Sequence, residues 1–466
     1  MKTYIEDCSV FRGFVNYKEN KSPFFYDCRT HILYIIPNSE EKWRENKQAL
    51  WDEFARPFIK KNEWIPRHYI KGYSEYETSI VFETTGEEDN INGFIQYEVS
   101  TVFEYNYGQK KFEGVSGLIF ESPELNDFYN ASSVYKHKKE EGEKIIVESI
   151  AKENKEIALF DYDDIQIKVD IKINRTIFYR VESPLKSKTQ LVFKFSKKIM
   201  DLDKLLDIIM IQNKFMQFIT YRKNVKFEKV RTIDINEDGR KENKGIVLFN
   251  KLIDNEEENN KYKKQRIIKL EDIENHVSNI YTLISKGDIY FSHLCSNISV
   301  ISSYNIMRIS RIFAEFERTY KQIYGDNVRS QLYYDTKNEI VFELRKLQEK
   351  YTGKKRECFK KIVRGIEKSN VGLEEKIKYA LQDCCDLIDI FLNYCYVKKE
   401  KIEDISSRLA ELRNDMIHGE MKHELEPINL DDIKILEILI YVIILKYANL
   451  SKDRIQNCIK DIFRII

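Results

Sequence analysis

The sequence has 466 residues, of which 42% are hydrophobic and 13% aromatic. A chain of this length and composition can bury sizeable cores and usually divides into two or three domains. Its 77 basic and 76 acidic residues give a net charge of +1. This balance excludes a general electrostatic attraction to nucleic acid, so any such binding needs a local basic patch.

Residues 1–197 carry the pattern of β-strands. Apolar and polar side chains alternate over 94–105 and 164–173, as they do in strands with one buried face. Shorter strand candidates lie at 32–36, 80–83, 117–120, 176–181 and 191–195. One helix is predicted at about 40–55. We expect a β-rich N-terminal domain that forms an antiparallel sandwich or a curved sheet.

Residues 198–298 have a mixed pattern. A helix is predicted at 201–220 and strands at 225–235 and 244–249. The polar stretches 236–244 and 254–266 are typical of loops. We interpret this middle region as α/β and as part of an N-terminal sensor or regulatory unit.

In residues 299–466 the apolar side chains recur every three or four residues, which is the spacing of α-helices. They contain a single proline, Pro427, which fits a helical region. The apolar positions from Ile306 to Ile323 define one helix, and Gly325 is placed to end it. Further helices are predicted at 336–351, 372–397, 401–418, 430–450 and 451–466, the last with Ser451 as its N-cap. We expect an all-α C-terminal bundle of antiparallel neighbours, which makes the whole chain an α+β multidomain protein.

The sequence carries no signal for secretion or for a membrane. Residues 1–7 lack the apolar core of a signal peptide. The most apolar run, 433–445, is shorter than the roughly 20 residues that span a bilayer. The eight cysteines show no C-x-x-C spacing, which favours reduced thiols. We expect a cytoplasmic protein.

The predicted helix at 401–418 carries the candidate chemistry. At about 100° per residue its apolar side chains share one face, which predicts packing into the bundle. These residues are Ile402, Ile405, Leu409, Leu412 and Met416. Arg413 and His418 flank a second stripe of small residues, formed by Ser406, Ser407, Ala410 and Asn414. The stripe is predicted to be the floor of an active site or the seam of a symmetric dimer.

An arginine, an amide and a histidine in this arrangement can cleave RNA without a metal. The 2′-hydroxyl of RNA is the nucleophile, His418 can transfer its proton near pH 7, and Arg413 can bind the phosphate through two N–H groups. Asn414 can orient the imidazole or bind a phosphate oxygen, whereas Asp415 could pair with His418 instead. With Gly419 as its cap, the end of the helix favours the imidazolium form. The expected products are a 2′,3′-cyclic phosphate and a 5′-hydroxyl.

The run Arg413-Asn414-Asp415-Met416-Ile417-His418 resembles the R-x4–6-H signature of HEPN ribonucleases, in which a polar residue commonly follows the arginine. The resemblance covers 299–466. The domain order, with 10–14 (VFRGF) near the start, resembles the ApeA-like anti-phage HEPN proteins. The resemblance implies a homodimer whose two motifs build one composite site. It also implies cleavage of RNA, with tRNA among the candidates, that causes abortive infection after a phage-derived trigger acts on the N-terminal domain.

A basic segment supports RNA as the partner. Residues 345–364 contain nine basic and two acidic side chains, with Tyr351 and Phe359 between them. Such a segment can neutralise phosphates, and its aromatic rings can stack on unpaired bases. The RNA-binding candidates are Lys354, Lys355, Arg356, Lys360 and Lys361. The alternative is a pair of solvated helices without a ligand.

Other interpretations of the motif stay open. Arg413 could pair with Glu411 or Glu420, with His418 an ordinary residue at a helix end. His423 is either an accessory acid–base group or part of a loop. The remaining histidines are isolated, so neither a metal ion nor a cofactor is predicted. The residues favour a metal-independent endoribonuclease, which by the resemblance would serve anti-phage defence, and the alternative is a non-catalytic RNA-binding or dimerisation scaffold.

Overall fold

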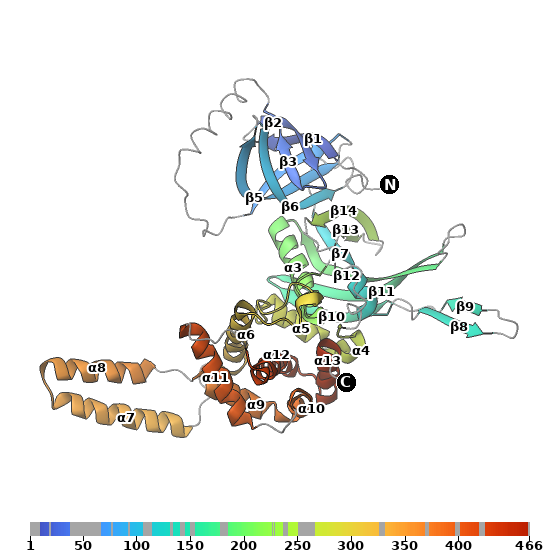
Figure 1. Ribbon diagram of the computed structural model, residues 1–466. Helices are drawn as coiled ribbons and strands as arrows, with labels where there is room; N and C mark the ends of the chain where they lie inside the picture. The colour runs from blue at the N-terminus through green and yellow to red at the C-terminus, as the bar shows by residue number, and fades with distance from the viewer. Residues whose placement is uncertain are drawn as a thin grey trace. The chain divides into compact units, whose positions relative to one another are not determined.

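The computed structural model describes two units of the chain (Figure 1). The described residues are 10–17, 20–37, 67–75, 78–91, 94–105, 114–130, 134–139, 145–149, 154–177, 185–225, 227, 229–235, 241–249, 266–325, 331–368, 372–396, 401–418 and 425–464. The predicted helix at 40–55 lies outside them. The first unit comprises 1–216 and 224–259, and the second comprises 217–223 and 260–466. We call them the β unit and the helical unit.

Six strands at the start of the β unit close into an antiparallel barrel. They are β1 (Val10–Tyr17), β2 (Asn20–Asp27), β3 (Ile32–Ile35), β4 (His68–Ser74), β5 (Ser79–Ile91) and β6 (Phe94–Tyr105). Their order is β6-β3-β2-β1-β4-β5, and β5 pairs again with β6. The alternate side chains that point inward form one apolar core, which includes Phe11, Phe24, Leu33, Phe82 and Val99.

Two glycines lie at the β1–β4 pairing that closes this barrel. Val15 is opposite Gly72, and Gly13 is opposite Ser74. A Cβ on Gly13 would clash with the carbonyl oxygen of Tyr73, and one on Gly72 would clash with the carbonyl oxygen of Phe14. The absence of side chains at these two positions therefore lets β1 and β4 approach closely enough to pair.

The sheet continues beyond the barrel through β6. One edge of β6 pairs with β3 and then with β14, so the described strands join into one 12-stranded sheet and a separate β8–β9 hairpin. The remaining strands are β7 (Val115–Glu121), β8 (Tyr135–Lys139), β9 (Ile145–Ser149), β10 (Lys155–Tyr162), β11 (Ile165–Ile177), β12 (Leu185–Ile199), β13 (Lys229–Ile235) and β14 (Lys241–Phe249). Two helices accompany them, α2 (Pro123–Phe128) and α3 (Leu202–Thr220). A curved sheet therefore forms, not a sandwich.

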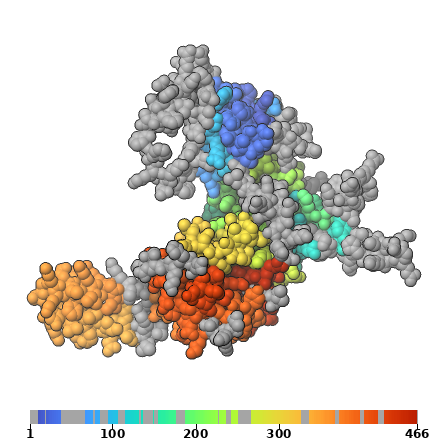
Figure 2. Space-filling model, in the orientation of Figure 1, coloured from blue at the N-terminus to red at the C-terminus, as the bar shows by residue number. Residues whose placement is uncertain are grey.

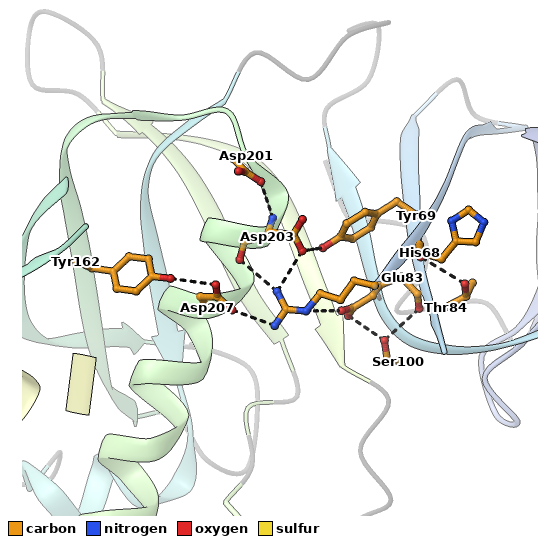
Figure 3. Close-up of polar contacts among 10 residues, drawn as sticks. His68, Tyr69, Glu83, Thr84, Ser100, Tyr162, Asp201, Asp203 and Asp207 are labelled. Atoms are coloured by element: carbon orange, nitrogen blue, oxygen red, sulfur yellow. Dashed lines mark hydrogen bonds and ion pairs between the residues drawn. The ribbon is translucent and has the colours of Figure 1, made fainter. Parts of the chain in front are cut away.

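Arg67, directly before β4, joins the barrel to α3 within the β unit. Its acidic partners Glu83, Asp203 and Asp207 are labelled in Figure 3. Its guanidinium lies 3.0 Å from Asp207, 3.3 Å from Asp203 and 3.4 Å from Glu83. The Tyr69 hydroxyl also donates to Asp203, at 2.7 Å. Burial alone would lower the pKa of Arg67, but the carboxylates raise it, Asp207 most strongly. The barrel is thus held to α3 by this ionic cluster and to the open sheet by β6.

The helical unit follows the β unit, which confirms the predicted α+β architecture. Its longer helices are α5 (Val277–Ser285), α6 (Ile306–Tyr324), α7 (Gln331–Glu349), α8 (Gly353–Lys368), α9 (Leu373–Asp383), α10 (Cys385–Cys395), α11 (Ile402–His418), α12 (Pro427–Tyr447) and α13 (Lys452–Phe463). The short turns α4 (Leu270–Ile273), η5 (Glu274–His276) and η6 (Ile298–Val300) complete it. Gly325 ends α6 with a φ of 76°, as predicted. Ser451 occupies the N-cap of α13, but its side chain makes no capping hydrogen bond.

Several predicted boundaries differ from the structure. The middle region 198–298 is not one body, because β13 and β14 belong to the sheet of the β unit whereas 260–298 belong to the helical unit. The predicted loop at 236–244 is wrong for 241–243, because β14 begins at Lys241 and not at the predicted Lys244. Glu242 and Asn243 pair there with Asp234 and Ile233, and these cross-strand hydrogen bonds override the polar composition.

The single helix predicted at 372–397 is two helices, α9 and α10, with a break at Cys384. In a continuous helix the N–H of Leu387 would donate to the carbonyl of Asp383. The Lys446 ammonium donates to that carbonyl at 3.0 Å, and Leu387 donates instead to the carbonyl of Cys384 at 2.9 Å. A side chain from α12 therefore accompanies the break.

Helix α12 is the centre of the helical unit, and nearly every residue from Asp432 to Leu445 is buried. Glu437 lies among them with 1% exposure. Arg308 of α6 donates to it at 2.9 Å, and the Tyr304 hydroxyl donates at 2.7 Å. The other amino group of Arg308 donates to three backbone carbonyls. These partners satisfy a buried carboxylate that would otherwise be strongly unfavourable.

Candidate functional site

The apolar face predicted for α11 packs into the helical unit. Ile405, Leu409 and Leu412 are buried, and Ile402 and Met416 are half-buried. The helix contacts α9, α12 and α6. This packing confirms the predicted apolar face and fixes which sides of α11 remain open.

Arg408 fixes α11 to α12. Its Nε lies 2.7 Å from Asp432 Oδ2, and its terminal amino group lies 2.9 Å from Oδ1. The Tyr396 hydroxyl donates to the same carboxylate at 2.5 Å. Burial, followed by the charge of Asp432, raises the pKa of Tyr396, so the phenol stays protonated as a donor. This planar pair sets the rotation of α11 and so the direction of Arg413, five residues later.

The small-residue stripe is not one open surface. Ser406 is fully buried, and its hydroxyl donates to the carbonyl of Glu403 at 2.9 Å. Ala410 is half-buried, whereas Asn414 is exposed. Ile417 is 59% exposed on the same side of the helix end. The stripe is therefore interrupted at Ser406 and open only near Asn414, and its role as a floor or a seam stays a prediction.

Arg413 reaches the surface beside two charged residues from other helices. Its guanidinium lies 3.7 Å from Glu317 of α6. The other oxygen of Glu317 lies 3.6 Å from the ammonium of Lys376 on α9. All three side chains are partly exposed, at 36% for Arg413, 33% for Glu317 and 20% for Lys376. Among the described residues Arg413 contacts Glu317 and not Glu411, and Glu420, the other partner considered from the sequence, lies outside them.

The backbone of α11 ends at His418, so Arg413, Asn414 and His418 share its last two turns. The side chain of His418, the cap at Gly419 and the accessory candidate His423 lie outside the described residues. Asp415 is exposed. The roles assigned to these residues stay predictions.

The five basic RNA-binding candidates all lie on α8 and are exposed: Lys354, Lys355, Arg356, Lys360 and Lys361. Helices α7 and α8 pack against each other as a hairpin (Figure 1), and Figure 2 shows the surface of this hairpin in orange. Between 335 and 366, Val363 is the one fully buried residue among those the structure describes. The five cations therefore lie on one helix, and their positions distribute them around the axis of α8.

Aromatic rings lie among these cations. Tyr351 and Phe359 stack with ring centroids 5.3 Å apart and planes 5° from parallel. The ammonium of Lys355 lies 5.7 Å from the centre of the Tyr351 ring, and that of Lys346 lies 4.1 Å from the centre of Phe342. Phe342 is 58% exposed. Exposed rings beside cations are typical of surfaces that bind single-stranded nucleic acid.

Comparisons of the chain with protein-family models, with curated proteins and with solved structures found no match. None of the helices in the described ranges is long and apolar enough to cross a membrane.

A pocket of about 630 Å³ also lies in the helical unit, lined by residues of α5, α6, α9 and α12. Its charged groups bind one another. The Lys446 ammonium lies 2.7 Å from the carboxylate of Asp383, which also accepts from the Tyr324 hydroxyl at 2.6 Å. Burial would raise the pKa of Asp383, but the hydrogen bonds from Lys446 and Tyr324 lower it overall. Because these groups already satisfy each other, the pocket is a weaker candidate than the surface beside Arg413.

Sequence reasoning missed Glu317, Lys376, Arg408 and Asp432. Glu317, Lys376 and Arg408 are common charged residues on helices, and nothing in their neighbourhoods marks them. Glu317 contacts residues of helices distant along the chain, whereas Arg408 and Asp432 join the consecutive helices α11 and α12. The one available signal was Asp432 at the start of a strongly apolar helix, since a carboxylate in such a helix needs a cationic partner.

Proposed function

We propose that the chain is a metal-independent endoribonuclease. Arg413 binds the scissile phosphate, and Asn414 orients the histidine or a phosphate oxygen. His418 takes the proton of the 2′-hydroxyl as the 2′-oxygen bonds to phosphorus, and a proton passes to the 5′-oxygen as the P–O5′ bond breaks. The products are a 2′,3′-cyclic phosphate and a 5′-hydroxyl. The observation that carries the proposal is the arginine, amide and histidine in the last two turns of α11, where Arg413 and Asn414 reach the surface.

In this proposal two copies of the helical unit build one composite site. The C-terminal turn of α11 leaves Ile417 and Asn414 exposed beside Arg413, which suits a seam where two identical surfaces meet. The hairpin of α7 and α8 holds the RNA through its exposed cations. The β unit acts as the sensor of a phage-derived trigger, and the enzyme works in the cytoplasm as part of abortive infection.

The test uses the purified full chain with single-stranded RNA and with tRNA, in the presence of a metal chelator. We expect cleavage that leaves 2′,3′-cyclic phosphate ends, and we expect DNA to be resistant. His418→Ala and Arg413→Ala should each lower the rate by about 10²–10⁴-fold. His276→Ala, a histidine of the same unit outside α11, is the matched control and should cleave normally. Equal cleavage by His418→Ala and the wild type would refute the catalytic assignment.

Assembly has a separate test. Light scattering at micromolar concentration should give the mass of a dimer, and Ile417→Glu should convert it to a monomer that no longer cleaves. A wild-type monomer with full activity would rule out a composite site.

A second candidate is a scaffold that binds RNA without cleaving it, and the hairpin favours it. The cations of α8 are exposed independently of α11, so they can bind RNA even if α11 has no catalytic role. In this case the wild type binds RNA without producing new ends, and replacing Lys354, Lys355 and Arg356 by glutamate abolishes binding. Activity that depends on His418 distinguishes the enzyme from the scaffold.

A further inference from the structure

Glu317 lies between two cations that belong to different helices. One carboxylate oxygen faces Arg413 of α11 at 3.7 Å, and the other faces Lys376 of α9 at 3.6 Å. Arg413 and Lys376 are far apart in the sequence, so the fold brings them to one anion. The helical unit therefore has an anion position made of an arginine and a lysine, and its own glutamate now occupies that position.

A phosphodiester can replace such a carboxylate. Both groups present two charged oxygens to their donors, and guanidinium and ammonium groups bind either one. Arginine supplies a directional contact, and lysine supplies a compact charge that tolerates a change of ligand. The pair that faces the oxygens of Glu317 has the composition of a phosphate site.

The geometry indicates that Glu317 can be displaced. Both of its contacts exceed hydrogen-bond distance, and all three side chains are partly exposed to water. The carboxylate of Asp432 is different, because it is 1% exposed and accepts three hydrogen bonds of 2.5–2.9 Å. A loose and exposed pair holds its partners weakly compared with such a buried one.

We propose that Lys376 is a second phosphate-binding residue beside Arg413, and that Glu317 competes with the RNA phosphate for both cations. This inference rests on the proposed ribonuclease function and adds a binding residue and a built-in inhibitor to it. RNA binding then requires the carboxylate of Glu317 to move away from Arg413 and Lys376. The competition lowers affinity for short or weakly bound RNA.

The chain offers a matched control pair. Lys378 of α9 lies 3.2 Å from Glu403 of α11, and both side chains are more exposed than Lys376 and Glu317. This pair joins two of the same helices with the same two residue types, but its contacts do not include Arg413. Any effect that comes only from net charge or from helix packing should appear equally in Lys378→Ala and Glu403→Gln.

The experiment measures the binding of a short 2′-O-methyl RNA, which has no free 2′-hydroxyl and so cannot be cleaved. Fluorescence anisotropy of the full chain is recorded over a series of salt concentrations. Glu317→Gln should bind about three- to tenfold more tightly than the wild type. Lys376→Ala should bind about three- to tenfold more weakly and lower the salt slope by about 1, as expected for one lost phosphate contact. Lys376→Arg should retain binding, and both control variants should match the wild type.

The results that overturn the inference are distinct from those that overturn the ribonuclease function. Weaker binding by Glu317→Gln, unchanged binding by Lys376→Ala, or no binding by either the wild type or Glu317→Gln would refute it. If RNA is cleaved and Arg413→Ala abolishes cleavage while Lys376 has no effect on binding, the ribonuclease stands and this inference fails. If no RNA is cleaved but the two variants shift binding in opposite directions, the anion site stands and the ribonuclease fails.

Discussion

Arg408 and Asp432 form a bidentate ion pair between α11 and α12, with N–O distances of 2.7 and 2.9 Å. The side chain of Arg408 is 26% exposed to solvent, whereas that of Asp432 is 1% exposed. Water can therefore reach the arginine but not the carboxylate. The pair places the candidate catalytic turn of α11 on the most buried helix of the unit.

This difference predicts unequal effects of the two single substitutions. Arg408→Ala leaves a buried carboxylate without its cation and should lower the free energy of unfolding by about 3–5 kcal/mol. Asp432→Asn leaves an arginine that can turn to water and should cost about 1–2 kcal/mol. Urea denaturation monitored by circular dichroism measures both. Lys378→Ala, from an exposed pair, should leave the midpoint unchanged, and an equal loss in Arg408→Ala and Lys378→Ala would contradict the prediction.

The pair formed by Arg308 and Glu437 predicts strong coupling. Glu437→Leu leaves the charge of Arg308 buried and uncompensated, so it should destabilise the helical unit by about 3–5 kcal/mol. Adding Arg308→Met removes that charge, so the double variant should be more stable than the sum of the two single changes. A double-mutant cycle by denaturant unfolding gives the coupling. If the losses of unfolding free energy in the two single variants simply add in the double variant, Arg308 and Glu437 have no specific interaction energy.

The neighbours Cys384 and Cys385 should differ in reactivity. Burial raises the pKa of Cys384 from its ordinary value of 9.0 to about 11, so its thiolate is scarce at pH 8. Cys385 is exposed. Iodoacetamide should therefore modify Cys385 in the folded chain and leave Cys384 intact, which fragmentation mass spectrometry of their shared peptide resolves. Both should react in denaturant, and equal rates in the folded chain would refute the difference.

Burial of thiols also predicts a loss of stability at high pH. Burial raises the pKa of Cys395 to about 11 as well. Between pH 9 and 11 the unfolded chain releases these protons and the folded chain keeps them, so stability falls as pH rises through this window. Urea midpoints across the window should show the fall, and Cys384→Ser should make it shallower. A stability that rises over this range would contradict the sign.

Two glycines with different surroundings should respond in opposite ways to alanine. Gly13→Ala places a Cβ against the backbone of β4, so it should destabilise the β unit by about 1–3 kcal/mol and loosen the β1–β4 pairing. Gly365 lies inside α8, and apart from its chain neighbours and the backbone of α8 no atom lies within 4 Å of the added Cβ. Gly365→Ala should stabilise the hairpin by about 0.5–1 kcal/mol. Thermal unfolding of both variants measures the two changes in stability. An unchanged melting temperature for Gly13→Ala would contradict the prediction.

The sequence predicts elements whose cause is local. β6 and α3 lie within one residue of their expected bounds, because their side-chain periods are regular over a long stretch. The apolar face of α11 was also predictable for this reason. Arg413, Asn414 and His418 are predicted from their spacing, from the stripe of small residues beside them and from the resemblance to the HEPN signature, and their catalytic roles stay predictions.

Features with distant causes could not be predicted. The closure of the barrel depends on Gly13 meeting β4 about 60 residues later, and the break at Cys384 accompanies a lysine of α12. The contact between Glu317 and Arg413 joins helices almost a hundred residues apart. No window of the sequence contains both members of these pairs, so neither periodicity nor spacing could reveal them.

Strand β6 pairs with barrel strands on both of its edges, with β5 on one and β3 on the other. Its last residues also pair with β14 of the open sheet. Opening either the barrel or the open sheet therefore removes hydrogen-bond partners from the same backbone. The two parts of the β unit should behave as one cooperative foldon, and the amides of Val102 and Phe103 should exchange with solvent only when the whole unit opens. A structural change in the barrel is then transmitted to the open sheet through the continuous backbone of β6, and not through a non-covalent interface that could rearrange.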